Sequence, residues 1–149
     1  MRALLLAATL VATAPASAID GWVDIHTASI HSDDLVEVDG TMYEINNTNP
    51  GIGITLDNTE NVSLRFGTFE NSYRNRSNYI AVDSHTSGPL VVGVSLGIVS
   101  GYALIPTDSN VRPMLVPHIG YQLKRVRAEL SYLHGEYTQA VALTVGFRF

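Results

Sequence analysis

The C-terminal stretch from Thr138 to Phe149 constrains the fold more strongly than any other part of the chain. Large apolar side chains occupy the odd positions Val141, Leu143, Val145, Phe147 and Phe149. Small or polar side chains occupy the even positions Ala142, Thr144, Gly146 and Arg148. Side chains that alternate with a two-residue period lie on opposite faces of a β-strand. This strand therefore has an apolar face that suits lipid and a small or polar face that suits the lumen of a barrel.

The aromatic residue at the end of this strand is a second feature. Chains whose last strand alternates in this way and stops on an aromatic residue, here Phe149, resemble bacterial outer-membrane β-barrels. The resemblance implies that the barrel-assembly machinery of the outer membrane reads this strand. The last strand of a soluble β-sandwich is the alternative interpretation.

The N-terminal stretch has the pattern of a secretory signal peptide. Met1-Arg2 supplies a charged start, an apolar run extends from Ala3 to Val11, and Ala16-Ser17-Ala18 forms a small-x-small cleavage site. We expect residues 1–18 to be removed and the mature chain to start at Ile19. Beyond that point no apolar run approaches the roughly 18 to 20 residues of a membrane helix. An exported protein of this kind is either soluble or a β-barrel.

Composition excludes several classes of function. The chain has no cysteine, which rules out disulfides and thiolate metal sites. Its formal charge is −5 and only 15% of its residues are charged. The chain therefore has no stripe of basic residues that could neutralise the phosphates of a nucleic acid. No spacing of residues forms a metal site, a P-loop or a dinucleotide fingerprint, so we expect no cofactor and no metal. We expect a monomer whose partners are outer-membrane lipids.

Alternation bounded by turn residues predicts about eight antiparallel strands, the smallest size of bacterial membrane barrel. The predicted strands are 21–31, 51–56, 62–67, 78–84, 90–98, 113–122, 125–132 and 138–149. Long and short connections alternate between them, as the external loops and periplasmic turns of bacterial barrels do. The predicted fold class is therefore all-β, a closed antiparallel transmembrane β-barrel of about eight strands after a cleaved signal peptide. Residues 19–149 form its single domain.

The predicted inner face carries charged and small side chains. Charges are expected at Arg65, Arg125, Arg127, Glu129 and Arg148, where pairing in the lumen avoids exposure to lipid. Small residues are expected at Gly51, Gly53, Gly67, Gly93, Ser95, Gly97, Ala140 and Ala142. These small residues either leave room for an acyl chain or alternate with large side chains that fill a narrow lumen.

Candidate catalytic residues fall at the external ends of the predicted strands. His31 ends the first strand, while Asn71 and Ser72 follow the third. A histidine beside a serine is the minimum for nucleophilic acyl transfer, because imidazole removes the hydroxyl proton as an acyl carbonyl is attacked. An exposed histidine at a loop edge and an Asn-Ser pair that starts a turn are the alternative interpretation.

From Asn49 onward the chain resembles the outer-membrane lipid A palmitoyltransferase family and related small eight-stranded barrels. The features that match, in order, are Gly51-Ile52-Gly53-Ile54, Phe69-Glu70-Asn71-Ser72, the stretch from Gly93 to Gly101, Pro113-Met114-Leu115-Val116-Pro117 and the end Phe147-Arg148-Phe149. The resemblance also implies that Pro50, Pro113 and Pro117 flank a gap through which lipid enters sideways. The alternative explanation is that these prolines simply lie at or near the starts of strands, where proline is common.

The resemblance implies a catalytic histidine and an Asp-Ser pair. By position these fall on His31, with His26 as the alternative histidine, and on Asn71 and Ser72. The implied reaction moves a palmitoyl chain from an outer-leaflet phospholipid to lipid A. Asn71 stands where the family has aspartate, so it can orient a histidine but does not stabilise an imidazolium as a carboxylate does.

A non-catalytic barrel is the second hypothesis. Such a barrel keeps the scaffold and serves envelope integrity, adhesion or another surface interaction. The predicted first external loop carries the acidic residues Asp33, Asp34, Glu37, Asp39 and Glu44. These carboxylates either bridge to lipopolysaccharide phosphates through divalent cations or simply face solvent.

Overall fold

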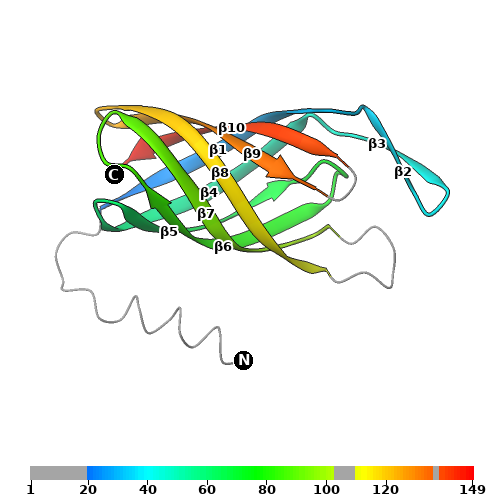
Figure 1. The fold of residues 1–149 in the computed structure, drawn as a ribbon, viewed down its shortest axis with the longest axis horizontal. Helices are drawn as coiled ribbons and strands as arrows, with labels where there is room; N and C mark the ends of the chain where they lie inside the picture. Colours follow the sequence, from blue (N-terminus) through cyan, green and yellow to red (C-terminus); the bar gives the residue numbers. More distant parts are fainter. Residues whose placement is uncertain (1–19, 103–109, 136–137) are drawn as a thin grey trace.

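The computed structural model describes residues 20–102, 110–135 and 138–149 (Figure 1). The predicted signal peptide, residues 1–18, lies outside the described residues. The strands are β1 (Gly21–His31), β2 (Leu35–Val38), β3 (Thr41–Glu44), β4 (Thr48–Thr59), β5 (Val62–Glu70), β6 (Arg76–His85), β7 (Leu90–Ser100), β8 (Val111–Leu123), β9 (Val126–His134) and β10 (Gln139–Arg148). Within the described ranges no helix is long and apolar enough to cross a membrane.

Eight of these strands form one closed antiparallel barrel. Their order around the wall is β1, β10, β9, β8, β7, β6, β5 and β4, and β4 pairs again with β1. The strand that ends the chain completes the wall, since β10 pairs with β1 from Trp22↔Arg148 to His31↔Ala140. The predicted all-β fold, a closed transmembrane barrel of about eight strands, is confirmed.

The remaining two strands, β2 and β3, form a hairpin that extends from one end of the barrel (Figure 1). The predicted first external loop, between the strands 21–31 and 51–56, contains this hairpin, which corrects the prediction of a loop. Asp39 and Gly40 both have positive φ angles, 49° and 73°, as a tight two-residue hairpin turn requires. Buried Val36 and Val38 pack with Ile45 against Tyr43 and Tyr73, and Tyr73 follows β5. The hairpin is therefore held by contacts with a distant loop.

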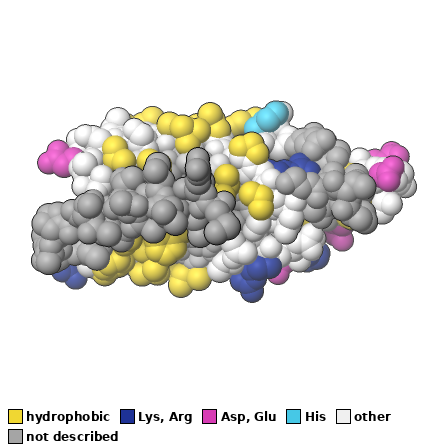
Figure 2. Space-filling model, turned by 90° about the horizontal axis from the view of Figure 1, so that it is seen from below, with side chains coloured by type: hydrophobic (Ala, Val, Ile, Leu, Met, Phe, Trp, Pro, Cys, Tyr) yellow, Lys and Arg dark blue, Asp and Glu magenta, His cyan; other side chains and the backbone are white. Residues whose placement is uncertain are grey.

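The outer wall of the barrel is covered by exposed apolar side chains, several of which are visible in Figure 2. They include Ile52, Val82, Leu90, Val92, Leu96, Ile98, Leu115, Ile119, Leu130, Val141 and Phe147. Exposure of so many large apolar groups in water is unfavourable, whereas in a bilayer they contact hydrocarbon. The alternation seen in the sequence thus places apolar groups on the lipid face of the wall.

Buried charges form one connected layer across the lumen. We define the ion-pair layer as Asp24, Arg65, Asp83, Arg127 and Glu129. Arg65 binds Glu129 through two hydrogen bonds of 2.6 and 2.8 Å. Arg127 donates to Asp24 at 3.0 Å. Pairing of this kind allows charges to remain inside a membrane protein.

Two of the predicted inward charges, Arg125 and Arg148, lie outside the ion-pair layer. Arg148 bonds through Nε to Asp20 at 2.9 Å and stacks over the ring of Trp22 at the end of the barrel that holds the short turns. Arg125 is exposed in the turn between β8 and β9, so the prediction that it faces the lumen was wrong. The turn interrupts the alternation, because the preceding Lys124 has a φ of 54°.

Replacing Leu96 by Arg tests the lipid-facing assignment. Leu96 is 55% exposed near the middle of β7, and an arginine on the lipid face near the bilayer midplane costs about 2–4 kcal/mol. We expect Leu96→Arg to lower the free energy of unfolding by about this amount in a reversible denaturant titration in lipid vesicles. Ser87→Arg, in the exposed turn before β7, serves as the control. Equal losses in the two variants would contradict a lipid-facing wall.

Candidate functional site

A β-bulge in β1 determines which of its side chains reach the lumen. Up to His26 the even residues of β1 face inward, but the register with β10 and with β4 shifts between His26 and Ala28. Thr27 is the additional residue, and its hydroxyl donates to the carbonyl of Leu143 at 3.0 Å. Beyond the bulge Ser29 and His31 face inward while Ile30 is 78% exposed. The bulge therefore turns His31 toward the interior at the outer end of the strand.

His31 lies between a hydroxyl and an amide. Its Nε2 is 2.6 Å from Oγ of Ser72, in the connection between β5 and β6. Its Nδ1 is 2.7 Å from Oδ1 of Asn47, just before β4. Since an amide oxygen only accepts, Nδ1 carries the imidazole proton and Nε2 is free to accept the proton of Ser72. This is the tautomer that a general base needs when it activates a serine.

The side chain of Asn71 was expected to orient the histidine, but its hydrogen bonds go to other groups. Its side chain is fully buried, and Nδ2 donates to Ser77 Oγ at 3.1 Å and to the Gly101 carbonyl at 2.7 Å. Its Oδ1 accepts from the backbone N–H groups of Tyr73 and Asn75 at 2.9 and 3.0 Å. These four bonds use both amide atoms. Asn71 thus shapes the loop that presents Ser72, and among the hydrogen bonds of the described residues none joins it to His31.

Asn47 occupies the position beside His31 that the sequence suggested for Asn71. It belongs to the polar run Asn46-Asn47-Thr48-Asn49, which in a sequence indicates only a loop. The sequence has no recognisable spacing that would place Asn47 beside His31, because the hairpin β2–β3 lies between them in the chain. The structure brings His31, Ser72 and Asn47 together, and the catalytic roles of His31 and Ser72 stay predictions.

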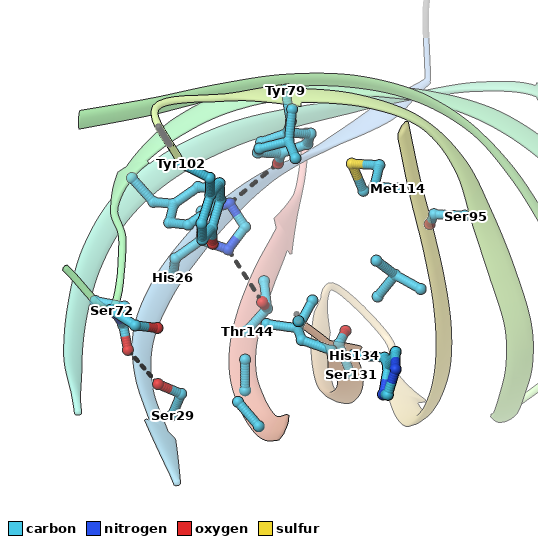
Figure 3. A pocket seen from close by; sticks show the side chains of 18 of the residues that line it. His26, Ser29, Ser72, Tyr79, Ser95, Tyr102, Met114, Ser131, His134 and Thr144 are labelled. Carbon is cyan, nitrogen blue, oxygen red and sulfur yellow. Dashed lines mark hydrogen bonds between the residues drawn. The ribbon is translucent and has the colours of Figure 1, made fainter. Parts of the chain in front are cut away.

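His26, the alternative histidine, lies deeper in the lumen. Its Nδ1 is 3.1 Å from Thr144 Oγ1 and its Nε2 is 3.0 Å from the hydroxyl of Tyr79 (Figure 3). Both ring nitrogens therefore have partners other than Ser72. The geometry favours His31 over His26 as the histidine that acts on Ser72.

A cavity of about 290 Å³ lies beside this site and opens at the loop end of the barrel. We call it the loop-side cavity. Ser72 and His31 are at its rim, and its wall is mainly apolar, with Phe69, Tyr102 and Met114 among the lining residues. Burial, with a smaller effect from Tyr73, raises the pKa of Tyr102 above its usual range, so this phenol stays neutral. A mostly apolar space with a few polar groups at one end is typical of a site for an amphiphilic ligand.

The small residues of the lumen do two different things. Ser95, Ala140 and Ala142 line the loop-side cavity and leave room there. At Gly53 an added Cβ would come within 2.3 Å of the Tyr79 hydroxyl, so this glycine accommodates a large side chain that crosses the lumen. The small residues thus border an open space at one height of the barrel and accommodate a large side chain at another.

The seam between β8 and β9 is incomplete toward the loop end. In the part of the chain that the structure describes, the ladder between them extends only from His118↔Ser131 to Leu123↔Val126. Pro113 and Pro117 lie in the outer part of β8, where proline has no N–H to donate. Pro113 of β8 and Leu133 of β9 both line the loop-side cavity. The cavity thus extends to the part of the wall beyond this ladder.

Comparison with known proteins supports the class of fold. A de novo designed transmembrane β-barrel superimposes with a TM-score of 0.62 and 14% identity, over 87% of this chain and 95% of the designed one. The N-terminal β-barrel domain of Pseudomonas aeruginosa OprF gives a TM-score of 0.52 and 16% identity, over 87% and 97%. The outer membrane protein Ail of Yersinia pestis gives 0.49 and 14%, over 88% and 99%. No known family model and no curated protein matches the chain.

The fold and these structural similarities define the class of protein. The chain is a small eight-stranded barrel of the outer-membrane type. At such low identity the similarity concerns the fold alone, so any activity has to be argued from the site.

Replacing Asn71 by Ala tests its role in the loop. The truncation leaves two backbone N–H groups and the Gly101 carbonyl without their partner, and an unsatisfied buried group costs about 1–3 kcal/mol. We expect the amides of Tyr73 and Asn75 to exchange with solvent markedly faster, as measured by NMR-detected hydrogen exchange in micelles. Asn58→Ala, at an exposed position of β4, should leave them unchanged. Unchanged protection in Asn71→Ala would show that the loop does not depend on this side chain.

Replacing Asn47 by Ala tests whether it sets the tautomer of His31. With Asn47 present, ¹⁵N NMR of the neutral imidazole should show the proton on Nδ1. Without it Nδ1 loses its acceptor, and the tautomer that donates from Nε2 to Ser72 should become populated. Asn75→Ala, an exposed asparagine of the neighbouring loop, is the control. The same tautomer ratio in Asn47→Ala and the wild type would contradict an orienting role for Asn47.

Proposed function

We propose that the protein is a bacterial outer-membrane acyltransferase that moves an acyl chain from a phospholipid to lipid A at the external leaflet. The observation that supports this proposal is the contact of 2.6 Å between His31 and Ser72. The sequence singled out these residues although 41 positions separate them. Export through a cleaved signal peptide and assembly through the C-terminal strand belong to the same proposal.

The chemistry follows from the donors and acceptors around the pair. His31 acts as general base and accepts a proton on Nε2, while Asn47 holds the ring through Nδ1. Ser72 acts as the nucleophile on the ester carbonyl or as the hydroxyl that orients the substrate. Overall, one phospholipid ester bond breaks, an ester to a lipid A hydroxyl forms, and the proton of that hydroxyl passes to the lysophospholipid.

Two further features support an acyl substrate. The loop-side cavity provides an apolar space beside His31 and Ser72, where an acyl chain would be removed from water. The part of the β8–β9 seam beyond the ladder, around Pro113 and Leu133, would provide a lateral route from the bilayer to that cavity. In the family that the sequence resembles, prolines flank such a route.

A non-catalytic surface barrel is the second candidate. The site contains an amide, Asn47, where a carboxylate would stabilise the imidazolium, which weakens the case for efficient catalysis. The hairpin β2–β3 extends from the barrel and exposes Leu35 and Met42 beside its acidic residues. An exposed hairpin of this composition suits adhesion or another surface interaction.

Mass spectrometry of lipid A from expressing cells separates the two candidates. An acyltransferase adds one acyl chain to lipid A, and His31→Ala should reduce the addition by roughly 10²–10⁴-fold because the general base is lost. Ser72→Ala should also reduce it, whereas Ser87→Ala, in an exposed turn at the opposite end, should retain it. All variants are compared at equal amounts of folded protein. Unmodified lipid A in cells with folded wild-type protein would favour the surface barrel.

A further inference from the structure

Three polar side chains form a hydrogen-bonded chain in a deeper part of the loop-side cavity. His26 is the middle member, with Nε2 at 3.0 Å from the Tyr79 hydroxyl and Nδ1 at 3.1 Å from Oγ1 of Thr144 (Figure 3). All three residues line the cavity. We call them the hydroxyl–imidazole chain. The proposed transfer at Ser72 gives none of them a role.

The position of the Tyr79 hydroxyl is fixed by the wall of the barrel. Tyr79 belongs to β6, and its side chain lies over Gly67 of β5 and Gly53 of β4 before it reaches His26 of β1. A Cβ added at either glycine would come within 3.0 Å of the hydroxyl. The ring of Phe69 packs against both partners, with centroids at 5.8 Å from His26 and 6.1 Å from Tyr79. The hydroxyl is thus held in place beside an apolar ring.

The hydroxyl–imidazole chain contains more protons than its own hydrogen bonds use. A neutral imidazole contributes one N–H, and Tyr79 and Thr144 contribute one O–H each. Two contacts use two of these three protons. If Nδ1 of His26 carries the proton, the O–H of Thr144 is in surplus, and if Nε2 carries it, the O–H of Tyr79 is in surplus. A protonated imidazole would leave both hydroxyl protons in surplus.

The surplus proton needs an acceptor inside the cavity. Thr144 is only 9% exposed, and among the described residues neither hydroxyl makes another hydrogen bond. A buried hydroxyl without an acceptor is unfavourable. Water can accept the proton while the cavity is open to solvent, but an acyl chain that fills the cavity displaces this water. A ligand that itself carries an oxygen at this depth restores the hydrogen bond.

The spacing along β1 gives the place of this oxygen on the ligand. His26 precedes His31 by five positions that include the bulge. With a strand rise of about 3.3 Å per residue, the two imidazoles are roughly 13–17 Å apart along the strand. An extended hydrocarbon with bonds near 1.5 Å advances about 1.25 Å per carbon, so this distance spans roughly ten to thirteen carbons. The oxygen therefore belongs to the far part of an acyl chain whose ester lies at Ser72.

We propose that the loop-side cavity selects acyl chains that carry a hydroxyl group in their far part, and that the hydroxyl–imidazole chain recognises this group. A ligand hydroxyl accepts the surplus proton and offers its own proton to a free lone pair of Thr144 or Tyr79. A site built to bond a hydroxyl discriminates against the analogue that lacks it. The choice of an acyl chain as the ligand rests on the proposed function.

Equilibrium binding of three fatty acids tests this selection, with the full chain folded in phospholipid nanodiscs and empty nanodiscs as the blank. The probes are 12-hydroxystearic, 2-hydroxystearic and stearic acid, of which the first two are isomers that differ only in the position of the hydroxyl. Isothermal titration calorimetry should give a dissociation constant for the 12-hydroxy acid that is roughly three- to tenfold lower than for the other two. Equal binding of the two isomers by the wild type would overturn the proposal.

Variants connect the preference with the hydroxyl–imidazole chain. The double variant Tyr79→Phe with Thr144→Val removes both hydroxyls and should bind the three acids equally. Ser131→Ala removes a hydroxyl from another part of the cavity wall and should keep the preference. Folding is checked by far-UV circular dichroism and by heat-modifiable mobility in gels. If the double variant does not fold, the two single variants replace it, and at least one of them should lose the preference.

A preference that persists in the folded double variant, or in both single variants, would overturn the proposal. Acyl transfer to lipid A from phospholipids with a 12-hydroxystearoyl or a stearoyl chain is a separate measurement by mass spectrometry. The hydroxylated donor should be used several-fold faster. A binding preference without transfer from either donor would refute the acyltransferase and uphold the recognition of the hydroxyl. The two proposals therefore fail by different results.

Discussion

The pairing of β10 with β1 is the interaction on which the other features depend. In hydrocarbon an unpaired backbone N–H or C=O has no water to bond, so a sheet that spans a bilayer has to close on itself. Closure with eight strands fixes a narrow lumen that side chains nearly fill. The loop-side cavity lies where Ser95, Ala140 and Ala142 present short side chains to the lumen, and the charges of Asp24, Arg65 and Glu129 border it.

A single additional residue, Thr27, allows β1 to form part of the wall and also to carry His31 of the candidate site. An unbroken strand would keep Trp22, Asp24 and His26 inward and would continue with Ala28 and Ile30, leaving His31 on the lipid face. The bulge at Thr27 reverses this order, so that the apolar Ile30 faces outward and His31 faces Ser72. The irregularity costs ladder hydrogen bonds locally, which Thr27 partly replaces through its bond to Leu143. One local irregularity thus keeps an apolar residue on the lipid face and places His31 in the candidate site.

The sequence contained enough information for the barrel and only part of the site. Alternation is a local property, so it predicted the strands, the lipid face and the inward positions of Arg65, Arg127 and Glu129. It failed at Arg125, where a turn interrupts the period. The hairpin β2–β3 has short strands in an acidic stretch, and its core needs Tyr73 from another loop. Asn47 was missed for the same reason, because its contact with His31 exists only after folding.

The ion-pair layer connects the candidate site with the centre of the barrel. Asp24, Arg65 and Glu129 form the floor of the loop-side cavity, and His26, Tyr79 and Thr144 lie in its lining. An apolar chain in this cavity can extend only to the depth at which the charges begin, because covering ion pairs with hydrocarbon removes what remains of their solvation. The buried charges therefore set the depth of the cavity that an acyl group could occupy.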